Sequence, residues 1–472
     1  MTGPGARRDE DNHEYMNRRH FLRASVSATA LAALPRAAAT PRPGVAQLIV
    51  AAADQSLVGS SHPRTAVWAY NGTVPGPELR LRQGERLRLS VENRLDVETT
   101  VHWHGIRLPN AMDGVPHLTQ PPIAARGGRF VYEFDLPDAG TYWYHPHLGS
   151  PEQVGRGLYG ALVVEERDPP PVDRDVVWVL SDWRLDREAR SVGDFRNFMD
   201  ASHAGRIGNT VTVNGTVRDS WAVRAGERIR LRLVNASNAR IYGLRFEGHA
   251  PWVIALDGHP VEPHPSEQVV LGPGMRADLI LDCAAAPGTA HRVIDDFYAR
   301  RAYELLKLAY SGEAPLRGRF PDAPRLPDNP VAIPDLTKAE RHRLVFAGGM
   351  MGAIPAQREH RGLFWTVNGV PMREDAHRHE PLMTLAHRRS HVIELVNDTV
   401  WDHPIHLHGH TFLVTSRNGK PNPRREWSDT VLLRPDDRAE IALVADNPGN
   451  WMLHCHVLEH QASGMMAVVR VS

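Results

Sequence analysis

The feature of this sequence that most limits its fold is a strand-like segment that occurs three times. The segment LRQGERLRLSVEN at residues 81–93 returns as VRAGERIRLRLVN at 223–235 and, more loosely, as AHRRSHVIELVND at 386–398. Similarity at so long a period indicates one structural unit in three copies. The 472 residues of the chain leave room for three domains of roughly 150 residues each.

Apolar residues alternate with polar ones inside each copy, as Leu87, Leu89 and Val91 do in the first. This period of two is typical of a strand with one buried face. An Asn-Gly pair, which favours a tight turn, precedes each copy at residues 71–72, 214–215 and 368–369. The 37 prolines and 38 glycines divide the chain into short segments. We therefore predict an all-β protein made of three tandem β-sandwiches.

The expected boundaries follow from the repeats and from two proline-rich stretches, EERDPPPVDRD (165–175) and FPDAPRLPDNP (320–330). We read these stretches as linkers. The predicted segments are an N-terminal signal at 1–39 and sandwich domains at 45–167, 168–320 and 330–472.

The N-terminal segment resembles a twin-arginine export signal. Arg18 and Arg19 precede an Ala-rich run, and cleavage is expected near Ala39; the start is Met1 or Met16. The resemblance implies passage through the export machinery to the periplasm or the outside. No later stretch approaches the roughly 18 uncharged apolar residues of a membrane span, so we expect none. The formal net charge is zero, which gives no reason to expect nucleic acid as a partner.

Histidine is the unusual residue of this chain, with 26 copies. Four clusters stand out: HWHG at 102–105, HPH at 145–147, HPIHLHGH at 403–410 and HCHVLEH at 454–460. The first two belong to the first repeat and the last two to the third. The middle repeat has none.

Each cluster contains a His-x-His pair, and side chains two apart on a strand point to the same face. If the first and third domains meet, eight imidazoles can converge on one cavity. Eight neutral imidazoles favour copper at a nuclearity above one, because zinc needs only four ligands. The four pairs are His102/His104, His145/His147, His406/His408 and His454/His456.

A second group of ligands has the opposite parity. Cys455 lies between His454 and His456 and so faces away from them, and His403 faces away from His406. With His460 and a more distant Met465, these residues form a His₂Cys set with a weak thioether, which describes a blue-copper electron-transfer site. Cys283, the one other cysteine, is expected to be a buried structural thiol.

With these residues in place, the chain resembles a three-domain multicopper oxidase of the bacterial laccase and cuprous oxidase type. The resemblance also covers TVPGPELRLRQGE, NAMDGVP, GTYWYHPH, SDTVLLRPDDRAE and ADNPGNWMLHCH. It implies three cupredoxin-like Greek-key domains and four copper ions, one type 1, one type 2 and two type 3. By motif, type 1 takes His403, Cys455, His460 and Met465, type 2 takes His102 and His406, and type 3 takes His104, His145, His147, His408, His454 and His456.

The activity implied is one-electron oxidation of phenolic or similar aromatic reductants, coupled to four-electron reduction of O₂ to water. Cys455 links the two sites through its histidine neighbours. The alternative is oxidation of Cu(I) or another low-valent metal ion in copper homeostasis. Other classes are a non-catalytic exported relative of the cell-division type, which the full ligand set disfavours, and an electron-transfer or nitrite-reducing protein, which would not need eight imidazoles.

Five further residues are tied to this resemblance. Asp113, in NAMDGVP, is our candidate proton relay, whereas Gln461 stands where many bacterial members have Glu and cannot donate a proton as an acid does. Asp429 could accept a phenolic proton near type 1 copper, or it is a turn residue at the end of a strand. Met350 and Met351 have no methionine-rich insert around them, and we interpret the pair as core residues rather than metal ligands.

Overall fold

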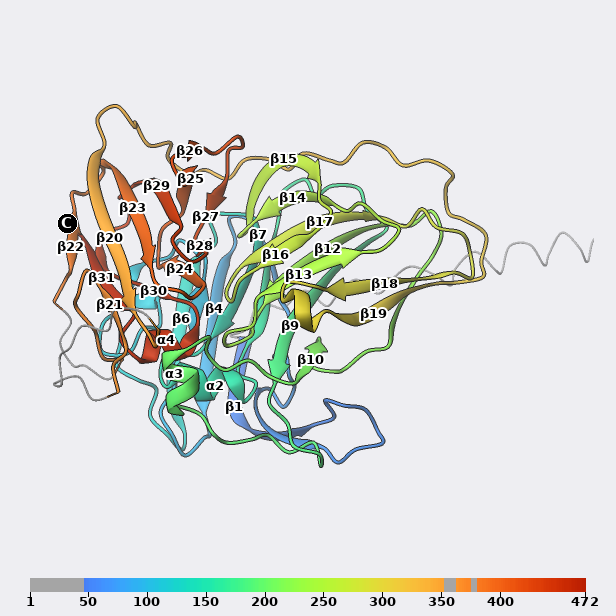
Figure 1. The fold of residues 1–472 in the computed structure, drawn as a ribbon, viewed down its shortest axis with the longest axis horizontal. Coiled ribbons are helices and arrows are strands. Elements are labelled where there is room, and N and C mark those ends of the chain that lie inside the picture. Colours follow the sequence, from blue (N-terminus) through green and yellow to red (C-terminus); the bar gives the residue numbers. More distant parts are fainter. Residues whose placement is uncertain (1–45, 352–361, 375–379) are drawn as a thin grey trace, which may run out of the picture. The chain divides into compact units, whose positions relative to one another are not determined.

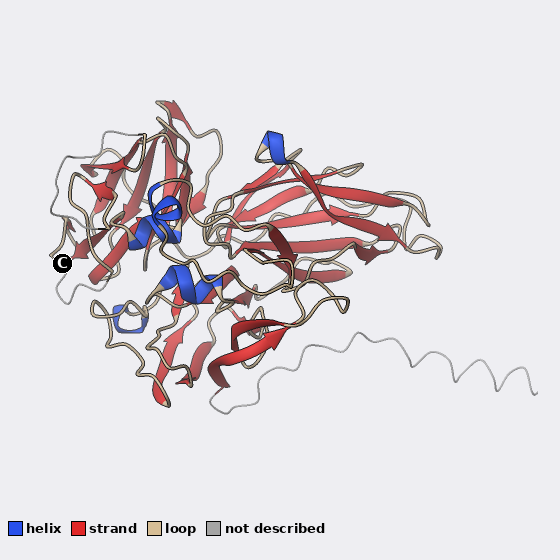
Figure 2. Ribbon diagram, turned by 60° about the horizontal axis from the view of Figure 1, so that its bottom comes forward, coloured by secondary structure: helices blue, strands red, loops and turns tan. Residues whose placement is uncertain are grey.

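The computed structural model describes residues 46–351, 362–374 and 380–472. The signal predicted at residues 1–39 lies outside them. Strands dominate the described chain, with short helices between them (Figure 2). Six sheets pair into three cupredoxin-like sandwiches that follow one another from blue to red in Figure 1. The all-β prediction is confirmed, and the domain boundaries stay predictions.

The first sandwich closes its core between one sheet in the order β2-β1-β4-β6 and another in the order β3-β8-β7-β5. Its elements are β1 (Ala46–Gln55), β2 (Thr65–Tyr70), β3 (Leu79–Arg82), β4 (Arg86–Asn93), β5 (His102–His104), η1 (Asn110–Met112), β6 (Gly128–Asp135), β7 (Gly140–His145), α2 (Ser150–Gly155) and β8 (Gly160–Glu165).

The second sandwich has the sheet orders β10-β9-β12-β17-β14-β15 and β11-β19-β18-β13-β16. Its elements are β9 (Arg174–Trp183), α3 (Phe198–Ser202), β10 (Thr210–Val213), β11 (Ser220–Val223), β12 (Arg228–Asn235), β13 (Tyr242–Phe246), β14 (Trp252–Leu256), β15 (His259–Pro265), β16 (Val269–Leu271), β17 (Arg276–Asp282), β18 (Ala290–Asp295), η2 (Ala299–Arg301) and β19 (Tyr303–Tyr310).

The third sandwich pairs β21-β20-β23-β29-β25-β26, with β27 beside β25, against β22-β31-β30-β24-β28. Its elements are β20 (Glu340–Gly348), β21 (Trp365–Val367), β22 (Met383–Leu385), β23 (Ser390–Asp398), β24 (His403–Leu407), β25 (Phe412–Arg417), β26 (Lys420–Pro421), β27 (Trp427–Ser428), β28 (Thr430–Leu433), β29 (Arg438–Val444), β30 (Gly449–Cys455), α4 (Leu458–Ala462) and β31 (Met466–Val471).

The repeated segment occupies the same place in all three sandwiches. Its strands β4, β12 and β23 each pair in parallel with the first strand of the domain and antiparallel with β6, β17 and β29. The turn residues Asn71, Asn214 and Asn368 have φ of 53°, 52° and 51°, the left-handed region that Asn tolerates. Each Asn also accepts a backbone N–H of its domain's first strand through Oδ1. The triplication predicted from sequence is therefore confirmed.

Three short helices, one from each domain, lie together near the domain contacts (Figure 1). α4 of the third domain packs against α2 of the first and α3 of the second. Of the residues described, none belongs to a helix long and apolar enough to cross a membrane.

A buried ion network joins the first and second domains. Asp278 on β17 accepts hydrogen bonds from Arg230 at 2.7 Å, from Arg232 at 3.1 Å and from Thr141 on β7 at 2.6 Å. Arg230 also donates to both oxygens of Glu166. Both guanidinium groups are fully buried, so each depends on its carboxylate partners to offset the loss of hydration.

Asp278→Ala is expected to lower the free energy of unfolding by about 3–5 kcal/mol, because it leaves two buried guanidinium groups short of a partner. Asp135→Ala removes an exposed carboxylate paired with Arg86 and serves as the control, with an expected cost much smaller than that of Asp278→Ala. Urea unfolding of both variants measures the difference, and equal costs would contradict the role given to Asp278.

Candidate metal centre

Strand pairing sets the histidine pairs side by side within each domain. In the first domain β5 pairs with β7 so that His102 lies opposite His145. In the third, β24 pairs with β30 so that His406 lies opposite His454. Because alternate residues share a face, each domain presents four imidazoles on one side.

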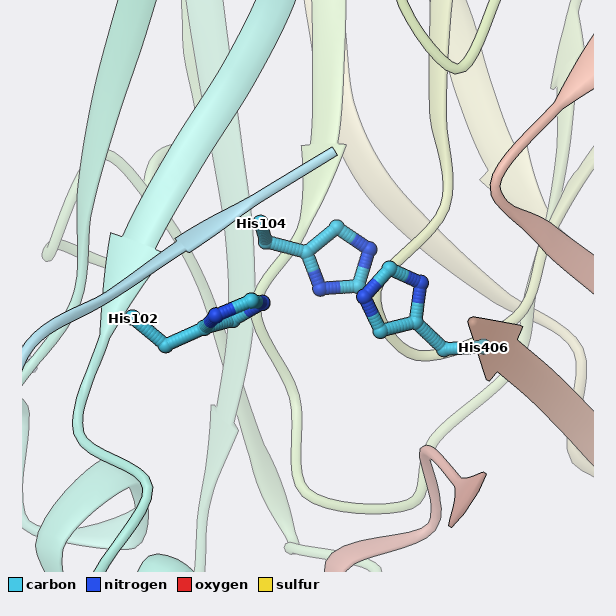
Figure 3. Close-up of side chains that lie close together, drawn as sticks. All are labelled: His102, His104 and His406. Atoms are coloured by element: carbon cyan, nitrogen blue, oxygen red, sulfur yellow. The ribbon is translucent and has the colours of Figure 1, made fainter. Parts of the chain in front are cut away.

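The two sets of imidazoles meet at the contact between the first and third domains. The ring of His104 stacks on that of His406 with centroids 3.8 Å apart, and His102 stacks on His408 at 3.9 Å. Figure 3 shows His102 and His104 pointing from β5 toward His406 on β24. The convergence predicted from strand parity is confirmed.

The ring nitrogens of these residues gather into sets in which all donor atoms lie within 4.8 Å of one another. All of the side chains are buried. The sets are His104, His145 and His456; His147, His408 and His454; and His102, His104 and His406.

Unpaired nitrogens show that these residues fit metal ions. His102 and His406 donate Nδ1–H to the backbone oxygens of Asp113 and Asp429, which leaves Nε2 of each ring without a partner. His145 likewise donates Nδ1–H to the backbone oxygen of Pro146, and its Nε2 has no partner. A buried lone pair without a donor is costly, and a partner that fixes the other nitrogen is the usual arrangement of a metal-bound imidazole.

The protonation states also suit metal binding. Burial first, and the neighbouring imidazoles second, hold the pKa of His145, His147, His408 and His456 well below its usual value. The rings are therefore neutral at physiological pH, with lone pairs available. Imidazoles without thiolates suit copper among the first-row metals.

The second group, on the other face of β30, consists of His403, Cys455 and His460. Nδ1 of His403 lies 3.4 Å and Nδ1 of His460 3.7 Å from Sγ of Cys455. Burial raises the pKa of the Cys455 thiol, so a metal ion is needed to hold it as thiolate. Met465 is buried in the same core, and its backbone oxygen accepts the N–H of Cys455. Cys455 and Cys283 are both free and buried, as expected.

Asp113 lies where the sequence predicted an acid near the cluster. Its Oδ2 accepts Nδ1–H of His408 at 2.9 Å, and its Oδ1 is 3.2 Å from Nδ1 of His102. The carboxylate is buried and connects one imidazole of the first domain with one of the third.

Gln461 also touches the cluster. Its side-chain amide is fully buried and 3.4 Å from Nδ1 of His147, while Oε1 has no partner. For Nε2 of His147 to bind a metal, Nδ1 must carry the proton, and the amide oxygen is the matching acceptor after a flip of the amide. Gln461 can accept a hydrogen bond here, but it has no acidic proton to donate.

The middle domain contributes an arginine that the sequence analysis missed. Arg276 on β17 donates to Oδ1 and Oδ2 of Asp429 at 2.9 and 2.5 Å, and Oδ1 accepts Nε2–H of His104 at 3.0 Å. Burial alone would raise the pKa of Asp429, but Arg276 and His104 hold it well below its usual value. The expectation that Asp429 accepts a phenolic proton is wrong, because this carboxylate is fully buried and bonded to Arg276 and His104.

A glycine of the same domain lets its backbone approach the histidines. Gly274 has φ of 84°, and a Cβ there would lie 2.9 Å from the ring of His456 and 3.0 Å from that of His104. No sequence signal in this repeat, which has no histidine cluster, pointed to this contact. Arg276 and Gly274 act through neighbours that are distant in the chain.

Helix α3 of the middle domain covers the Cys455 group. Nε2 of His460 donates to the backbone oxygen of His203 at 2.5 Å. Trp365 packs 4.2 Å from His460 and donates to the backbone oxygen of Ala201. The group of His403, Cys455 and His460 is thus covered by α3 and the residue that follows it, His203.

The outer side of this layer carries apolar side chains. Phe198 and Met199 of α3 are 52% and 59% exposed, and Phe198 packs against Phe364 at 5.3 Å. The N–H of Met350 bonds the oxygen of Ser202, which brings this segment to α3. Met351 is 81% exposed, so its interpretation as a core residue is wrong.

Comparison with known proteins agrees with this geometry. Three family models, each described as multicopper oxidase, match residues 52–169, 174–321 and 354–472. The chain is 30% identical to the multicopper oxidase MmcO of Mycobacterium tuberculosis, over 85% of this chain and 82% of that protein.

Two solved structures are similar over most of their length. A multi-copper oxidase from Pseudomonas thermotolerans is 39% identical with a TM-score of 0.81, covering 91% of this chain and 99% of that one. A laccase-like multi-copper oxidase, CueO, from a lignin-degrading Ochrobactrum species with oxidase activity towards lignin model compounds is 30% identical with a TM-score of 0.78, covering 92% and 98%.

Arg276→Gln is expected to weaken copper binding at the histidine cluster about 10- to 100-fold, the usual effect of losing a partner behind a metal ligand. Copper per chain after dialysis against a chelator should fall, while the blue absorbance of the Cys455 group persists. Arg292→Gln, which breaks an exposed pair with Glu247, is the control. Unchanged copper content in Arg276→Gln would contradict the role of this ion pair.

Proposed function

The chain belongs to the multicopper oxidase family, and on that premise we propose how its two groups of ligands divide the reaction and which reductants they serve. It is a laccase-like oxidoreductase with copper as cofactor, and its reaction needs O₂ and a reductant. Bound copper supplies one-electron chemistry at the Cys455 group and four-electron reduction of O₂ to water at the histidine cluster.

Ligand roles follow from the sets described above. In this proposal type 1 copper would be held by His403, Cys455, His460 and Met465. Type 2 is held by His102 and His406, whose free Nε2 atoms support the assignment. Of the type 3 pair, one ion is held by His104, His145 and His456 and the other by His147, His408 and His454, as their grouping favours.

Cys455 provides the electron route between the groups. Its neighbours in the chain, His454 and His456, each belong to a different set of the cluster. The path from the thiolate to the cluster therefore runs through two short stretches of backbone, and strand alternation keeps the two groups on opposite faces of β30.

Asp113 is the proposed proton relay. It is the carboxylate that bonds His408 and lies beside His102, so it can hold a proton within reach of the cluster. Gln461 occupies the corresponding place near His147, but an amide cannot act as a general acid.

Aromatic reductants are the proposed substrates. The observation that carries this is the exposed Phe198, which lies with Phe364 on the layer covering His460. The exposed ring of Phe198 offers a phenol a surface to stack on, and His460 is bonded to the backbone oxygen of His203 at the end of the same helix.

Oxidation of Cu(I) is the second candidate, favoured by the exposed thioethers of Met199 and Met351. Thioethers are soft donors that select Cu(I). Met199 belongs to α3, which covers the Cys455 group, and Met351 follows Met350, whose N–H bonds Ser202 of α3. We also propose that the protein is exported by the twin-arginine route to the periplasm or the outside, on the basis of Arg18 and Arg19.

Oxygen uptake with a phenol, a Cu(I) complex and Fe(II), compared side by side, tests the substrate. Phe198→Ala should raise KM for the phenol about 10-fold, equivalent to about 1.4 kcal/mol of lost contact, and leave Cu(I) oxidation unchanged. Met351→Leu keeps the size of the side chain and should affect Cu(I) alone. Cys455→Ser, which should be colourless and inactive, gives the blank. Equal effects of both variants on all reductants would contradict a reductant site here.

Gln461→Glu is expected to raise kcat at saturating reductant, by up to about 100-fold, the lower end of what a positioned general acid contributes. The physical reason is that the new carboxylic acid can supply a proton beside His147. Gln461→Met fills similar volume without a proton and should give no increase. Stopped-flow reoxidation of the reduced protein by O₂ measures the step, and an unchanged rate in Gln461→Glu would rule out proton supply from this position.

A further inference from the structure

A second cluster of metal-type donors lies in the third domain, at the start of its parallel strands β20 and β23. Glu340 pairs in register with His391, and His342 with Ile393. Because side chains two apart share a face, Glu340 and His342 project to the same side as His391. This is the side that carries the core residues Leu344 and Ile393, so the cluster sits where the core of the sandwich ends.

The donor atoms of these three residues are close together. Nε2 of His342 is 3.1 Å from Nδ1 of His391. The carboxylate of Glu340 places Oε1 3.8 Å from Nε2 of His342 and Oε2 3.8 Å from Nδ1 of His391. Bonds of about 2.0–2.1 Å to a tetrahedral metal ion separate neighbouring donors by about 3.4 Å, and the observed distances lie on either side of that value.

The surroundings orient these groups for binding. His391 is fully buried, and its Nε2–H donates to the backbone oxygen of Ala386 at 3.1 Å. This bond leaves the lone pair of Nδ1 directed at the cluster, which is how a backbone carbonyl fixes a metal-binding imidazole. Burial also lowers the pKa of His342, which favours the neutral ring that a metal requires.

We propose that Glu340, His342 and His391 bind one divalent zinc or copper ion. Two imidazoles and a carboxylate are a donor set that both ions accept. The Glu340 side chain is 60% exposed, so the remaining coordination position faces water. The ion clamps the first residues of β20 to β23 and to the turn that contains Ala386.

This site is separate from the two groups of the oxidase. Ala386 follows β22, whose Leu385 pairs with Val471, and Val471 pairs with Gly449 at the start of β30. Cys455 is at the other end of the same strand, about 20 Å away at the rise of an extended chain. Changes at Glu340 or His342 therefore leave the oxidase ligands in place.

Titration of the copper-loaded full-length protein with Zn²⁺, followed by calorimetry, tests the site. We expect one Zn²⁺ to bind per chain, with the blue absorbance and the four oxidase coppers retained in the same sample. If the site binds copper instead, the protein as isolated should contain a fifth copper ion that is not blue. His342→Gln should lack this ion. Zinc should also raise the melting temperature, because it binds only the folded domain.

Glu340→Gln and His342→Gln are expected to weaken Zn²⁺ binding at least about 10-fold, the effect that losing even an outer partner has on metal affinity. Both residues are at the protein surface or half-buried, and retained blue colour and oxidase activity report correct folding. His264→Gln, which removes a half-buried imidazole of the second domain, should bind zinc as the wild type does.

Three results would overturn the proposal. One is the absence of both bound zinc and a fifth copper. Another is zinc that binds only by displacing oxidase copper. The third is binding that Glu340→Gln and His342→Gln leave unchanged. In each case His342 and His391 are a hydrogen-bonded pair and no more.

Discussion

Eight buried imidazoles from two domains meet at one contact. The residues around them supply hydrogen bonds that offset the free-energy cost of burying the rings. A buried nitrogen without a partner destabilises the fold, and several of these rings have such a nitrogen aimed into the cluster. Backbone oxygens and two buried carboxylates, Asp113 and Asp429, satisfy the other nitrogens. The protein thus holds open lone pairs in fixed directions, which is what a preorganised metal site requires.

The middle domain supplies none of the proposed copper ligands, yet it holds the ligand-bearing domains in position. Arg276 supplies the charge that keeps Asp429 ionised between His104 and His406, and Gly274 allows the close approach of backbone to the rings. The same strand, β17, carries Asp278, which ties Arg230 and Arg232 to Thr141 of the first domain. One strand therefore stabilises both the cluster and a domain interface through buried charges.

Strand β30 connects the two groups of ligands. Alternation sends Cys455 into the core of the third domain and its neighbours His454 and His456 to the interface. In the proposed assignment, the covalent backbone therefore fixes the distance between type 1 copper and the oxygen-reducing cluster. α3 covers His460, and its outer side carries the exposed apolar surface at which we propose that reductants bind.

The sequence by itself determined the three sandwiches, the face to which each histidine points and the division of the ligands into two groups. These are local properties: period-two alternation, Asn-Gly turns and residue spacing act within a few residues, so they can be read directly. Only the tertiary structure decided what surrounds the ligands. Arg276 and Gly274 reach the cluster from a repeat without histidine clusters, Asp429 is buried rather than exposed, and Met351 is exposed rather than buried. These facts depend on contacts between residues far apart in the chain, and neither spacing nor periodicity encodes which distant surfaces will meet.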